Sequence, residues 1–316
     1  MVILLRYRDN DVFCFYITSY VPFEKKPMNN DLVPAINFHL WKYCNFKCKF
    51  CFATYEDESE LYNLKSHLSE NEMLKIIDEI SEQKITKITF AGGEPMLCKW
   101  LTNLIKYSKA KGLTTMIVTN GYLLNEKWLQ NLNGTLDWIT LSIDTIDSKN
   151  QIKIGRETKG KYISENDFLE KVKLIKNHNI RFKLNTVVNS VNRNENLIEF
   201  VKKIKPERWK IFQVLPIEGQ NDLYINQLLI SKLEYDNYLK RHKEVEKYGI
   251  EIVAEDNDLM TGSYLMIDPQ GRLYDNVNGK YNYSQSILEI GFNKAREQIS
   301  LNKRKFVERK GLYEWS

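Results

Sequence analysis

Apolar positions recur along this chain with two different periods. Short runs rich in β-branched and aromatic residues each predict a strand, and they lie at 34–40, 85–92, 114–121, 136–144, 180–188 and 208–215. Between them, segments such as 69–83 and 164–179 carry apolar residues three and four positions apart, which is typical of amphipathic helices. Those two segments and a third, 231–249, each begin with a serine that is followed three residues later by Glu or Asp. This capping box predicts where each helix begins.

Strands that alternate with helices pair in parallel, because a helical crossover returns the chain to the same end of the sheet. Right-handed crossovers curl such a sheet toward a barrel. We therefore predict an α/β fold, a partial (β/α)6 barrel of the TIM type, over residues 33–250. Residues 251–316 lack the alternation and are predicted to form a C-terminal extension that closes the open side. Residues 1–32 form an N-terminal segment to which the sequence assigns no role.

The composition indicates a metal or redox protein of a reducing compartment. The chain has an odd number of cysteines, five, and three of them are packed into one short loop, which does not suit a disulfide framework. The formal charge of +5 comes without a block of like charges, so we expect no direct binding to nucleic acid. The N-terminus has neither the order of a signal peptide nor a long apolar stretch. We predict a cytoplasmic monomer without membrane attachment.

Unusual residues follow the predicted strands at the ends where parallel α/β folds bind their ligands. The sequence CNFKCKFC at 44–51 follows the first strand, and GGEP at 92–95 follows the second. Asn120, Ser142 and Asn185 lie late in the third, fourth and fifth strands. Because these strand ends meet on one side of a barrel, we predict a single shared site.

The cysteine loop carries the clearest chemical signal. Thiolates from Cys44, Cys48 and Cys51 can bind three irons of a [4Fe–4S] cluster and leave the fourth iron open to a small ligand. The alternative is a structural zinc site in which His39 or His67 is the fourth ligand. Cys14 and Cys98 fit neither pattern and are expected to be ordinary buried thiols.

The GGEP turn offers Gly92 and Gly93 for close backbone approach, and the carboxylate of Glu94 can accept hydrogen bonds from an ammonium group. The alternative is an ordinary turn between a strand and a helix. Asn120 and Ser142 end apolar strands, so they either bind a small polar ligand or are satisfied within turns and caps.

Four basic residues lie on predicted strands rather than in loops: Lys87, Lys183, Arg208 and Lys210. Arg208 and Lys210 are two positions apart and therefore share one face of their strand. Cations that point into a barrel need an anion to offset their repulsion, and a triphosphate would supply one. Alternatively, these side chains lie at solvated strand ends.

The cysteine spacing, the aromatic residue after it and the GGEP turn resemble the radical S-adenosylmethionine enzymes, in which the cosubstrate occupies the open iron. A more specific likeness is to the viperin family and its prokaryotic members. It is carried by NFHLWKYCNFKCKFCF, ITFAGGEP, IGR, FKLNTVVN, RWKIFQVLPIEG and SYLMID. The likeness runs from about residue 33 to the C-terminus.

The resemblance implies two cofactors, a [4Fe–4S] cluster and S-adenosylmethionine, and a ribonucleoside triphosphate substrate (CTP, UTP or GTP). Enzymes of this kind take hydrogen from C4′ of the ribose and form the 3′-deoxy-3′,4′-didehydro nucleotide, which terminates viral RNA synthesis. Their electrons come from an external donor of the flavodoxin or ferredoxin type. The membrane-binding helix of animal viperins is absent here, and the loop 53–67 is longer and more acidic, so the preferred base stays open.

The resemblance also implies roles for particular residues. S-Adenosylmethionine would be bound by Gly92, Gly93, Glu94, Asn120, Ser142 and Arg156, with Glu94 on its ammonium group and Ser142 and Arg156 on its carboxylate. The triphosphate would be bound by Lys87, Lys183, Asn185, Arg208 and Lys210, and Tyr264 would donate a hydrogen atom or a proton late in the reaction. Two rival functions remain: a radical enzyme that acts on a peptide or protein, and a non-enzymatic iron–sulfur or zinc binding module.

Overall fold

A computed structural model describes residues 32–64, 66–132 and 134–315 of the chain. The predicted N-terminal segment lies outside the described residues except for Leu32, and so does Cys14. The boundary drawn at residue 250 stays a prediction.

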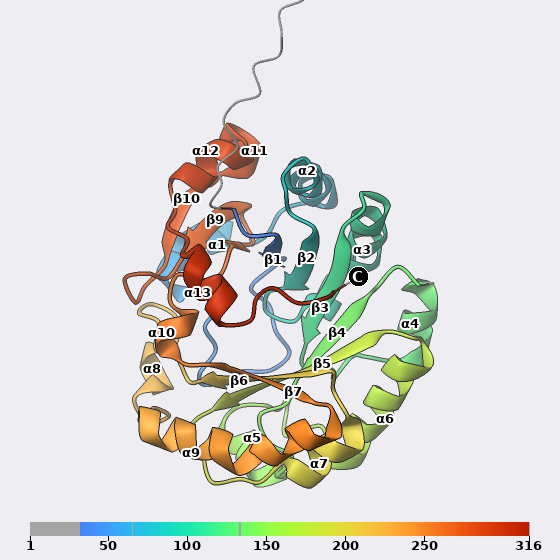
Figure 1. Cartoon of the computed structure of the whole chain (residues 1–316). Coiled ribbons are helices and arrows are strands. Elements are labelled where there is room, and N and C mark those ends of the chain that lie inside the picture. The colour runs from blue at the N-terminus through green and yellow to red at the C-terminus, as the bar shows by residue number, and fades with distance from the viewer. Residues whose placement is uncertain (1–31, 65, 133, 316) are drawn as a thin grey trace, which may run out of the picture. The chain divides into compact units, whose positions relative to one another are not determined.

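The described part of the chain is built on one 10-stranded sheet with the order β10-β9-β8-β1-β2-β3-β4-β5-β6-β7 (Figure 1). The strands are β1 Ala35–His39, β2 Lys87–Ala91, β3 Thr114–Thr119, β4 Trp138–Ser142, β5 Arg181–Val188, β6 Arg208–Gln213, β7 Glu251–Glu255, β8 Met266–Ile267, β9 Arg272–Asp275 and β10 Asn282–Ser286. Strands β1 to β7 pair in parallel, and so do β8 and β1, whereas β9 is antiparallel to both β8 and β10. The α/β class with a parallel, barrel-like sheet is therefore confirmed.

Helices connect successive parallel strands and pack on the outside of the curved sheet (Figure 1). The α-helices are α1 Ser59–Leu64, α2 Glu70–Ser81, α3 Leu101–Ala110, α4 Glu126–Leu132, α5 Ser148–Lys153, α6 Glu165–Asn177, α7 Ile198–Ile204, α8 Asp222–Ile225, α9 Lys232–His242, α10 Asn257–Met260, α11 Ile287–Ile290, α12 Phe292–Glu297 and α13 Lys303–Glu308. Short 3-10 helices are η1 Glu56–Glu58, η2 Pro95–Leu97 and η3 Lys243–Tyr248.

The three predicted capping boxes are all present, at Ser69, Ser164 and Ser231. Each serine side chain accepts a hydrogen bond from the backbone three residues later, which fixes the start of α2, α6 and α9. The third helix differs from the prediction at its other end. It stops at His242, and a 3-10 segment continues to Gly249, whose left-handed φ of 78° ends it.

The region after residue 250 contributes strands to both edges of the sheet. Strand β7 follows α9 and η3 and pairs with β6, so it forms a seventh strand–helix unit. Strand β8 pairs with β1 at the other edge. These strands escaped the sequence analysis because β8 has two residues and β7 has no helix of clear periodicity after it.

The six central strands have opposite polarity on their two faces. Outward-facing residues are apolar and fully buried under the helices, as Ile36 and Phe38 are in β1. Inward-facing residues alternate with them and are often polar, as Asn37 and His39 are in the same strand. The barrel therefore has its apolar core between sheet and helices, and a partly polar interior.

Residues 310–315 cross the amino-terminal ends of the barrel strands, where Figure 1 shows this segment in dark red. The backbone oxygen of Lys310 accepts from Arg208 at 3.0 Å, and that of Trp315 accepts from Trp138 at 2.9 Å. The ring of Tyr313 packs edge-on against Trp138. This segment closes the end of the barrel opposite to the cysteine loop.

Candidate active site

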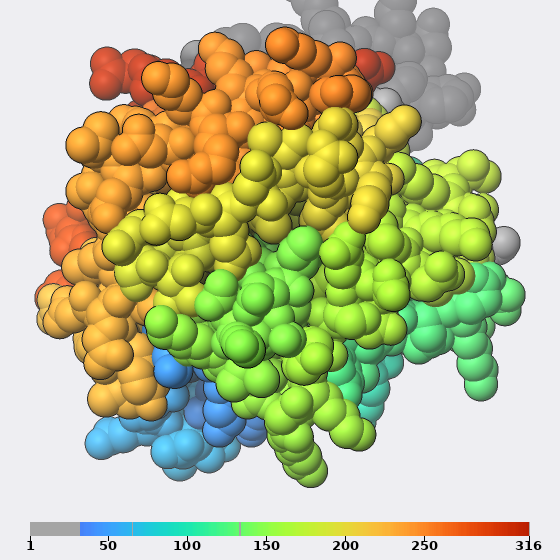
Figure 2. Space-filling view, turned by 90° about the horizontal axis from the view of Figure 1, so that it is seen from below, coloured from blue at the N-terminus to red at the C-terminus, as the bar shows by residue number. Residues whose placement is uncertain are grey.

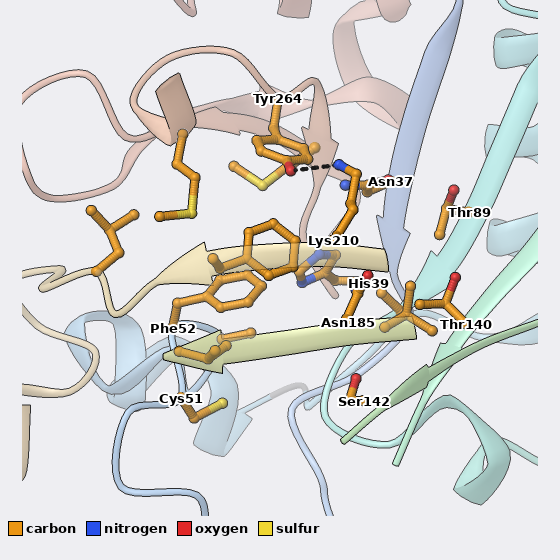
Figure 3. Close-up of a pocket in the computed structure, with 18 of the residues that line it drawn as sticks. Asn37, His39, Cys51, Phe52, Thr89, Thr140, Ser142, Asn185, Lys210 and Tyr264 are labelled. Carbon is orange, nitrogen blue, oxygen red and sulfur yellow. Dashed lines mark hydrogen bonds between the residues drawn. The ribbon is translucent and has the colours of Figure 1, made fainter. Parts of the chain in front are cut away.

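A cavity of about 300 Å³ runs through the barrel, from the cysteine loop at the carboxyl ends of the strands to Tyr313 near the amino ends. The inward-facing positions of β1 to β6 line it, and Figure 3 labels polar members of this lining, among them Asn37, Thr89, Thr140 and Asn185. The cavity joins two chemically different ends, which are described in turn.

Cys44, Cys48 and Cys51 all line the cysteine end of the cavity. The loop that carries them is held by the segment after α5. Lys47 N donates to Gly155 O at 3.1 Å, and Lys49 N donates to Ile154 O at 3.0 Å. A Cβ atom at Gly155 would lie 2.0 Å from Lys47 O, so only glycine allows this contact.

The chemistry of the thiols fits an iron–sulfur cluster. Burial raises the pKa of Cys44 and of Cys48 to about 12, and burial also raises that of Cys51. Buried thiols of this kind ionise only beside strong positive charge, which cluster irons supply. Within residues 32–64, 66–132 and 134–315, no three His, Cys, Asp or Glu side chains are arranged around a single ion. A cluster does not require that arrangement, because each thiolate binds its own iron.

The two histidines of the zinc alternative have other partners. The Nδ1 atom of His39 lies 2.7 Å from the hydroxyl of Tyr55, and burial lowers the pKa of His39 to about 3, so its ring is neutral. His67 lies between the rings of Trp41 and Trp100, with Nδ1 2.8 Å from Leu68 O. These contacts do not favour either ring as a fourth zinc ligand.

Glu94 is a buried carboxylate beside the cysteine loop, with 1% of its surface exposed. Its Oε1 accepts from Thr119 Oγ1 at 2.6 Å and from Met96 N at 3.1 Å, and its Oε2 accepts from Asn120 N at 2.8 Å. Burial raises its pKa despite these bonds. A carboxylate can accept about four hydrogen bonds, so one acceptor site remains for a cationic ligand in the cavity.

Gly92 and Gly93 line the cavity, but glycine is required at both positions because their backbone lies close to the backbone of residues 40–43, not because of a ligand. A Cβ atom at Gly92 would lie 2.8 Å from Trp41 O, and one at Gly93 would lie 2.0 Å from Tyr43 O. The backbone of the GGEP turn instead continues the pairing of β1 and β2, since Gly93 N donates to Trp41 O and Glu94 N donates to Tyr43 O. The turn therefore sets the position at which the cysteine loop starts.

Asn120, Ser142 and Arg156 come together at the same end and line the cavity. The amide of Asn120 donates to Asn45 Oδ1 at 2.8 Å, which ties the end of β3 to the cysteine loop. Arg156 forms an ion pair with Asp144, directly after β4. Burial alone would lower the pKa of Arg156, but the negative charge of Asp144 raises it overall, so the guanidinium stays charged.

The opposite end of the cavity is a cluster of buried cations. Lys87 Nζ and Lys183 Nζ both donate to the hydroxyl of Tyr313, at 3.1 and 3.2 Å. Burial, and then repulsion from neighbouring cations such as Lys210, lower the pKa of both lysines well below the usual range. An anion bound between these lysines would reverse that shift.

Lys210, Glu255 and Tyr264 form a hydrogen-bonded group on one wall. Glu255 is fully buried, forms an ion pair with Lys210 and accepts from the hydroxyl of Tyr264. Lys210 Nζ also donates to the Tyr264 hydroxyl at 3.2 Å, the contact drawn as a dashed line in Figure 3. Burial lowers the pKa of Lys210 to about 8, and the charge of Glu255 limits the fall.

The structure gathers the predicted residues into one cavity with one exception. Asn185 lines its middle, and its side-chain oxygen has no partner among the described residues. Arg208 does not line the cavity, because its guanidinium lies 4.0 Å above the ring of Tyr313 and forms an ion pair with Glu251. Cys98 is buried in the core, as expected.

Two charged residues of the site were missed in the sequence. Arg309 is buried, its guanidinium lies 3.6 Å from the centre of the Tyr264 ring, and its Nε has no partner among the described residues. Glu255 ends β7, which was itself not predicted. The polar residue Asn37 was also missed, although its alternation with Ile36 and Phe38 is a signal that could have found it.

The sequence model of the Radical SAM superfamily matches residues 39–204. One relative, the S-adenosylmethionine-dependent nucleotide dehydratase of Flammeovirga pacifica, is 46% identical over 90% of this chain and 97% of its own length. A protein of the same name from Lacinutrix mariniflava is 48% identical over 90% of this chain, which spans only 59% of that relative's length.

Solved structures with a similar fold include the anSMEcpe structure determined with bound AdoMet. It superimposes with a TM-score of 0.63 at 15% identity, over 84% of this chain and 80% of that chain. The structure of Streptococcus suis SuiB bound to S-adenosylmethionine gives a TM-score of 0.58 at 17% identity, over 77% of this chain and 60% of that chain. At this identity the likeness concerns the fold alone. Among the described helices, none has the length and apolarity needed to cross a membrane.

Proposed function

This chain belongs to the radical SAM superfamily, and we propose that it is a radical S-adenosylmethionine enzyme that dehydrates a ribonucleoside triphosphate. The substrate is CTP, UTP or GTP, and the product is its 3′-deoxy-3′,4′-didehydro form. A polymerase that incorporates this product finds no 3′-hydroxyl to extend, so the reaction serves antiviral defence. We place the reaction in the cytoplasm and assign it to a monomer that does not itself bind nucleic acid.

The observation that carries the proposal is the single cavity with two unlike ends. The cysteine end offers three thiols and a buried carboxylate, which suit a metal cluster and an ammonium group. Four basic side chains line the other end, namely Lys87, Lys183, Lys210 and Arg309, and a fifth, Arg208, lies behind the Tyr313 ring. Only two carboxylates, Glu251 and Glu255, pair with these cations among the described residues. A triphosphate would offset the remaining positive charge.

The cysteine end holds the cofactors in this proposal. When bound, the cluster and S-adenosylmethionine would together supply the one-electron chemistry that removes hydrogen from C4′ of the ribose. Cys44, Cys48 and Cys51 would bind the irons, and Glu94 would accept a hydrogen bond from the ammonium group. Ser142 and Arg156 bind the carboxylate, Asn120 lies beside the adenosine, and Gly92 and Gly93 keep the turn close to the cysteine loop.

The cationic end fixes the nucleotide. Lys87, Lys183 and Lys210 contact the phosphates directly, and Arg208 acts from behind the Tyr313 ring. Asn185 and Arg309 each have a polar atom without a partner within the described part of the chain, which suits them to bind the nucleotide as well. Because the phosphates are held at one end and the cosubstrate at the other, the ribose is placed between them, where the reacting atoms must meet.

Tyr264 acts after hydrogen abstraction. Its hydroxyl is fixed by Glu255 and Lys210, at the border between the polar middle of the cavity and its cationic end. Burial raises the pKa of Tyr264 well above its usual range, so the phenol keeps its proton at neutral pH. The hydroxyl, whose hydrogen Glu255 accepts in this structure, would give its proton as the 3′-hydroxyl leaves as water, and one further electron from the external donor would complete the product.

The test is anaerobic incubation of the cluster-loaded, reduced enzyme with each of the four ribonucleoside triphosphates, followed by mass spectrometry. We expect a product lighter than its substrate by one water, with a pyrimidine favoured over a purine. Substrate deuterated at C4′ should transfer deuterium to 5′-deoxyadenosine. Nucleosides and monophosphates should react poorly, since losing one partner of a desolvated charge pair costs on the order of 2–5 kcal/mol. Equal turnover of nucleoside and triphosphate, or no deuterium transfer, would contradict the proposal.

A further inference from the structure

His39 is the last residue of β1, and its ring belongs to the lining of the cavity, where Figure 3 labels it. Only 2% of its surface is exposed. Its Nδ1 atom lies 2.7 Å from the Tyr55 hydroxyl and 3.1 Å from the Tyr274 hydroxyl, and these two hydroxyls are 3.2 Å apart. Its Nε2 atom has no hydrogen-bond partner among the described residues. One ring nitrogen is therefore bound by the protein, and the other is left for the cavity.

The two tyrosines are closed off from the cavity. Tyr55 and Tyr274 are fully buried, and neither lines the cavity. Burial raises the pKa of both well above the usual range, so both hydroxyls keep their hydrogens. If Tyr55 donates to Nδ1 of His39 and Tyr274 donates to the Tyr55 oxygen, both hydroxyl hydrogens have acceptors. The imidazole hydrogen is then on Nε2, where a ligand in the cavity can accept it.

The opposite tautomer of His39 leaves a buried donor unpaired. With its hydrogen on Nδ1, the ring would donate to one of the hydroxyls, and the two hydroxyl hydrogens would have a single acceptor between them. The remaining hydroxyl hydrogen would have no acceptor in a region closed to the cavity, which costs free energy. The tyrosine pair therefore favours the tautomer that carries its hydrogen on Nε2.

Tyr55 is brought to His39 by a strained backbone. Its φ of 55° lies in the left-handed region, which bulky residues rarely adopt. Gln220 holds this conformation, because its Oε1 accepts from Tyr55 N at 2.6 Å and its backbone oxygen accepts from Thr54 Oγ1 at 2.8 Å. Figure 2 shows the blue loop region at the surface beside the yellow-orange region that contains α8. Strain of this kind persists only where the surroundings impose it, and it concentrates at functional sites.

We propose that Tyr55 and Tyr274 are positioning residues, which hold His39 so that its Nε2–H donates to a ribose hydroxyl oxygen of the nucleotide. This inference rests on the proposed function, which places the ribose between the cationic end and the cysteine end of the cavity. Because burial lowers the pKa of His39, its ring is neutral and suits a neutral oxygen better than a phosphate. A nucleotide that lacks the hydroxyl would leave Nε2–H unpaired, so the contact selects ribose over deoxyribose.

The first measurement reads the tautomer by nitrogen NMR. The full chain is labelled with 15N in its four histidines and studied without its cluster, at a pH where free imidazole is neutral. The signals of His39 are those that His39→Gln lacks. We expect Nε2 to carry a hydrogen and Nδ1 to carry none. A hydrogen on Nδ1 would overturn the inference.

The second measurement is calorimetric binding of CTP, 2′-deoxy-CTP, 3′-deoxy-CTP and inorganic triphosphate to the cluster-loaded enzyme. Wild type should bind one of the two deoxy analogues at least fivefold more weakly than CTP, and we call this ratio the hydroxyl preference. Tyr55→Phe/Tyr274→Phe keeps both rings but lets His39 turn, so the hydroxyl preference should fall at least threefold. His39→Leu should abolish it. Inorganic triphosphate has no ribose, so its Kd should stay within about twofold of wild type in both variants.

The matched control is Tyr62→Phe/Tyr235→Phe. It also removes two buried hydroxyls, which donate to Asp268 and to the backbone oxygen of Ile211, and neither tyrosine lines the cavity. This variant should keep the hydroxyl preference of wild type.

A third substitution tests whether the tyrosines act through His39. Added to Tyr55→Phe/Tyr274→Phe, His39→Gln should raise the hydroxyl preference again, because an amide nitrogen always carries hydrogens and needs no partner to fix a tautomer. Should Tyr55→Phe/Tyr274→Phe fail to fold, Tyr274→Phe alone should lower the preference at least twofold.

Three binding results would also overturn the inference. The first is an unchanged hydroxyl preference in a folded Tyr55→Phe/Tyr274→Phe variant, and the second is an equal loss in the control. The third is an unchanged preference in His39→Leu together with weaker binding of S-adenosylmethionine, which would assign Nε2–H to the cosubstrate. Failure of the proposed function has a different signature, because wild type would then bind CTP no more tightly than cytidine and would form no dehydrated nucleotide.

Discussion

Tyr264 owes its position to Glu255 rather than to packing alone. The carboxylate accepts the phenolic hydrogen bond and at the same time neutralises Lys210, so one buried group orients two side chains that line the cavity. Replacing Tyr264 by phenylalanine removes the hydroxyl and keeps the ring beneath Arg309. The variant therefore separates the donor role from a packing role.

We expect Tyr264→Phe to bind substrate and cleave S-adenosylmethionine, but to yield at least tenfold less didehydro nucleotide per 5′-deoxyadenosine. The ratio of the two products, measured by mass spectrometry, is the readout. Tyr281→Phe is the control, because the Tyr281 hydroxyl also lies at the cavity but donates to the backbone oxygen of Phe52. A ratio in Tyr264→Phe equal to that of wild type would show that Tyr264 only packs.

His242 gives the fold a pH dependence that is separate from catalysis. Its ring is buried, Nε2 accepts from Leu197 N at 2.9 Å, and burial lowers its pKa from 6.5 to about 4. Below pH 6.5 the unfolded chain takes up a proton that the folded chain refuses until about pH 4. Stability is therefore present above pH 6.5 and is lost as the pH falls, by about 1.4 kcal/mol per pH unit within that window.

The variant His242→Gln removes this titration and leaves an acceptor for Leu197 N. The difference in free energy of unfolding between wild type and variant should shrink by up to about 3 kcal/mol between pH 6.5 and 4. Urea unfolding at a series of pH values measures it. A wild-type-to-variant difference that does not change with pH would contradict the assignment.

Sequence identified individual residues where their chemistry is unusual. Three close cysteines and a glutamate after two glycines are rare enough to read directly, and Lys87, Lys183 and Lys210 were visible as charges on apolar strands. Arg309 and Glu255 were not, because Glu255 ends the short strand β7 and Arg309 follows the short helix α13, and neither element gives a periodic signal. Both residues contact Tyr264, and Arg309 lies far from Tyr264 in the sequence.

At the scale of elements, the junction between the cysteine loop and α5 is the part most sensitive to a small change. We expect Gly155→Ala to reduce iron retention after cluster reconstitution at least fivefold, since the new Cβ would meet Lys47 O at 2.0 Å and the residue has a φ of +79°. Iron per chain is the measurement. Gly160→Ala is the control, because its φ of +77° is similar and its Cβ would meet no atom within 4 Å.

The Gly160→Ala variant isolates the cost of the left-handed backbone, which is about 1 kcal/mol, and should keep its iron. Equal iron content in both variants would mean that the close contact at Gly155 does not position the cysteines.

Strands β1 to β6 and the capped helices were predictable because their signals are local. The pairing of β8 with β1 and the docking of residues 310–315 were not, because such pairing depends on tertiary contacts rather than on local pattern.

At the scale of the whole molecule, the two ends of the cavity differ in chemistry, and the proposed function predicts that they bind their ligands independently. We expect CTP to stabilise the Cys44→Ala/Cys48→Ala/Cys51→Ala variant, which cannot hold a cluster. At a concentration of 100 times Kd the gain is about 2.7 kcal/mol, which raises Tm by several degrees. Differential scanning calorimetry measures the shift, and cytidine should give none.

Lys87→Ala/Lys183→Ala is the matched variant at the other end, and it should lose the CTP-induced shift while keeping its iron. A triple cysteine variant that CTP fails to stabilise would instead show that the cysteine end must be loaded before the nucleotide can bind.

The segment 310–315 has a consequence for how the protein is made. Lys87 and Tyr313 touch although 226 residues of chain separate them. A ribosome finishes every strand of the barrel before it supplies the residues that cover the amino-terminal ends of those strands. Until then the buried lysines of a growing chain have water rather than Tyr313 as their neighbour. The cationic end of the cavity can therefore be completed only after residues 310–315 are made, and a chain that stops before them would carry the cysteines without Tyr313 beside Lys87 and Lys183.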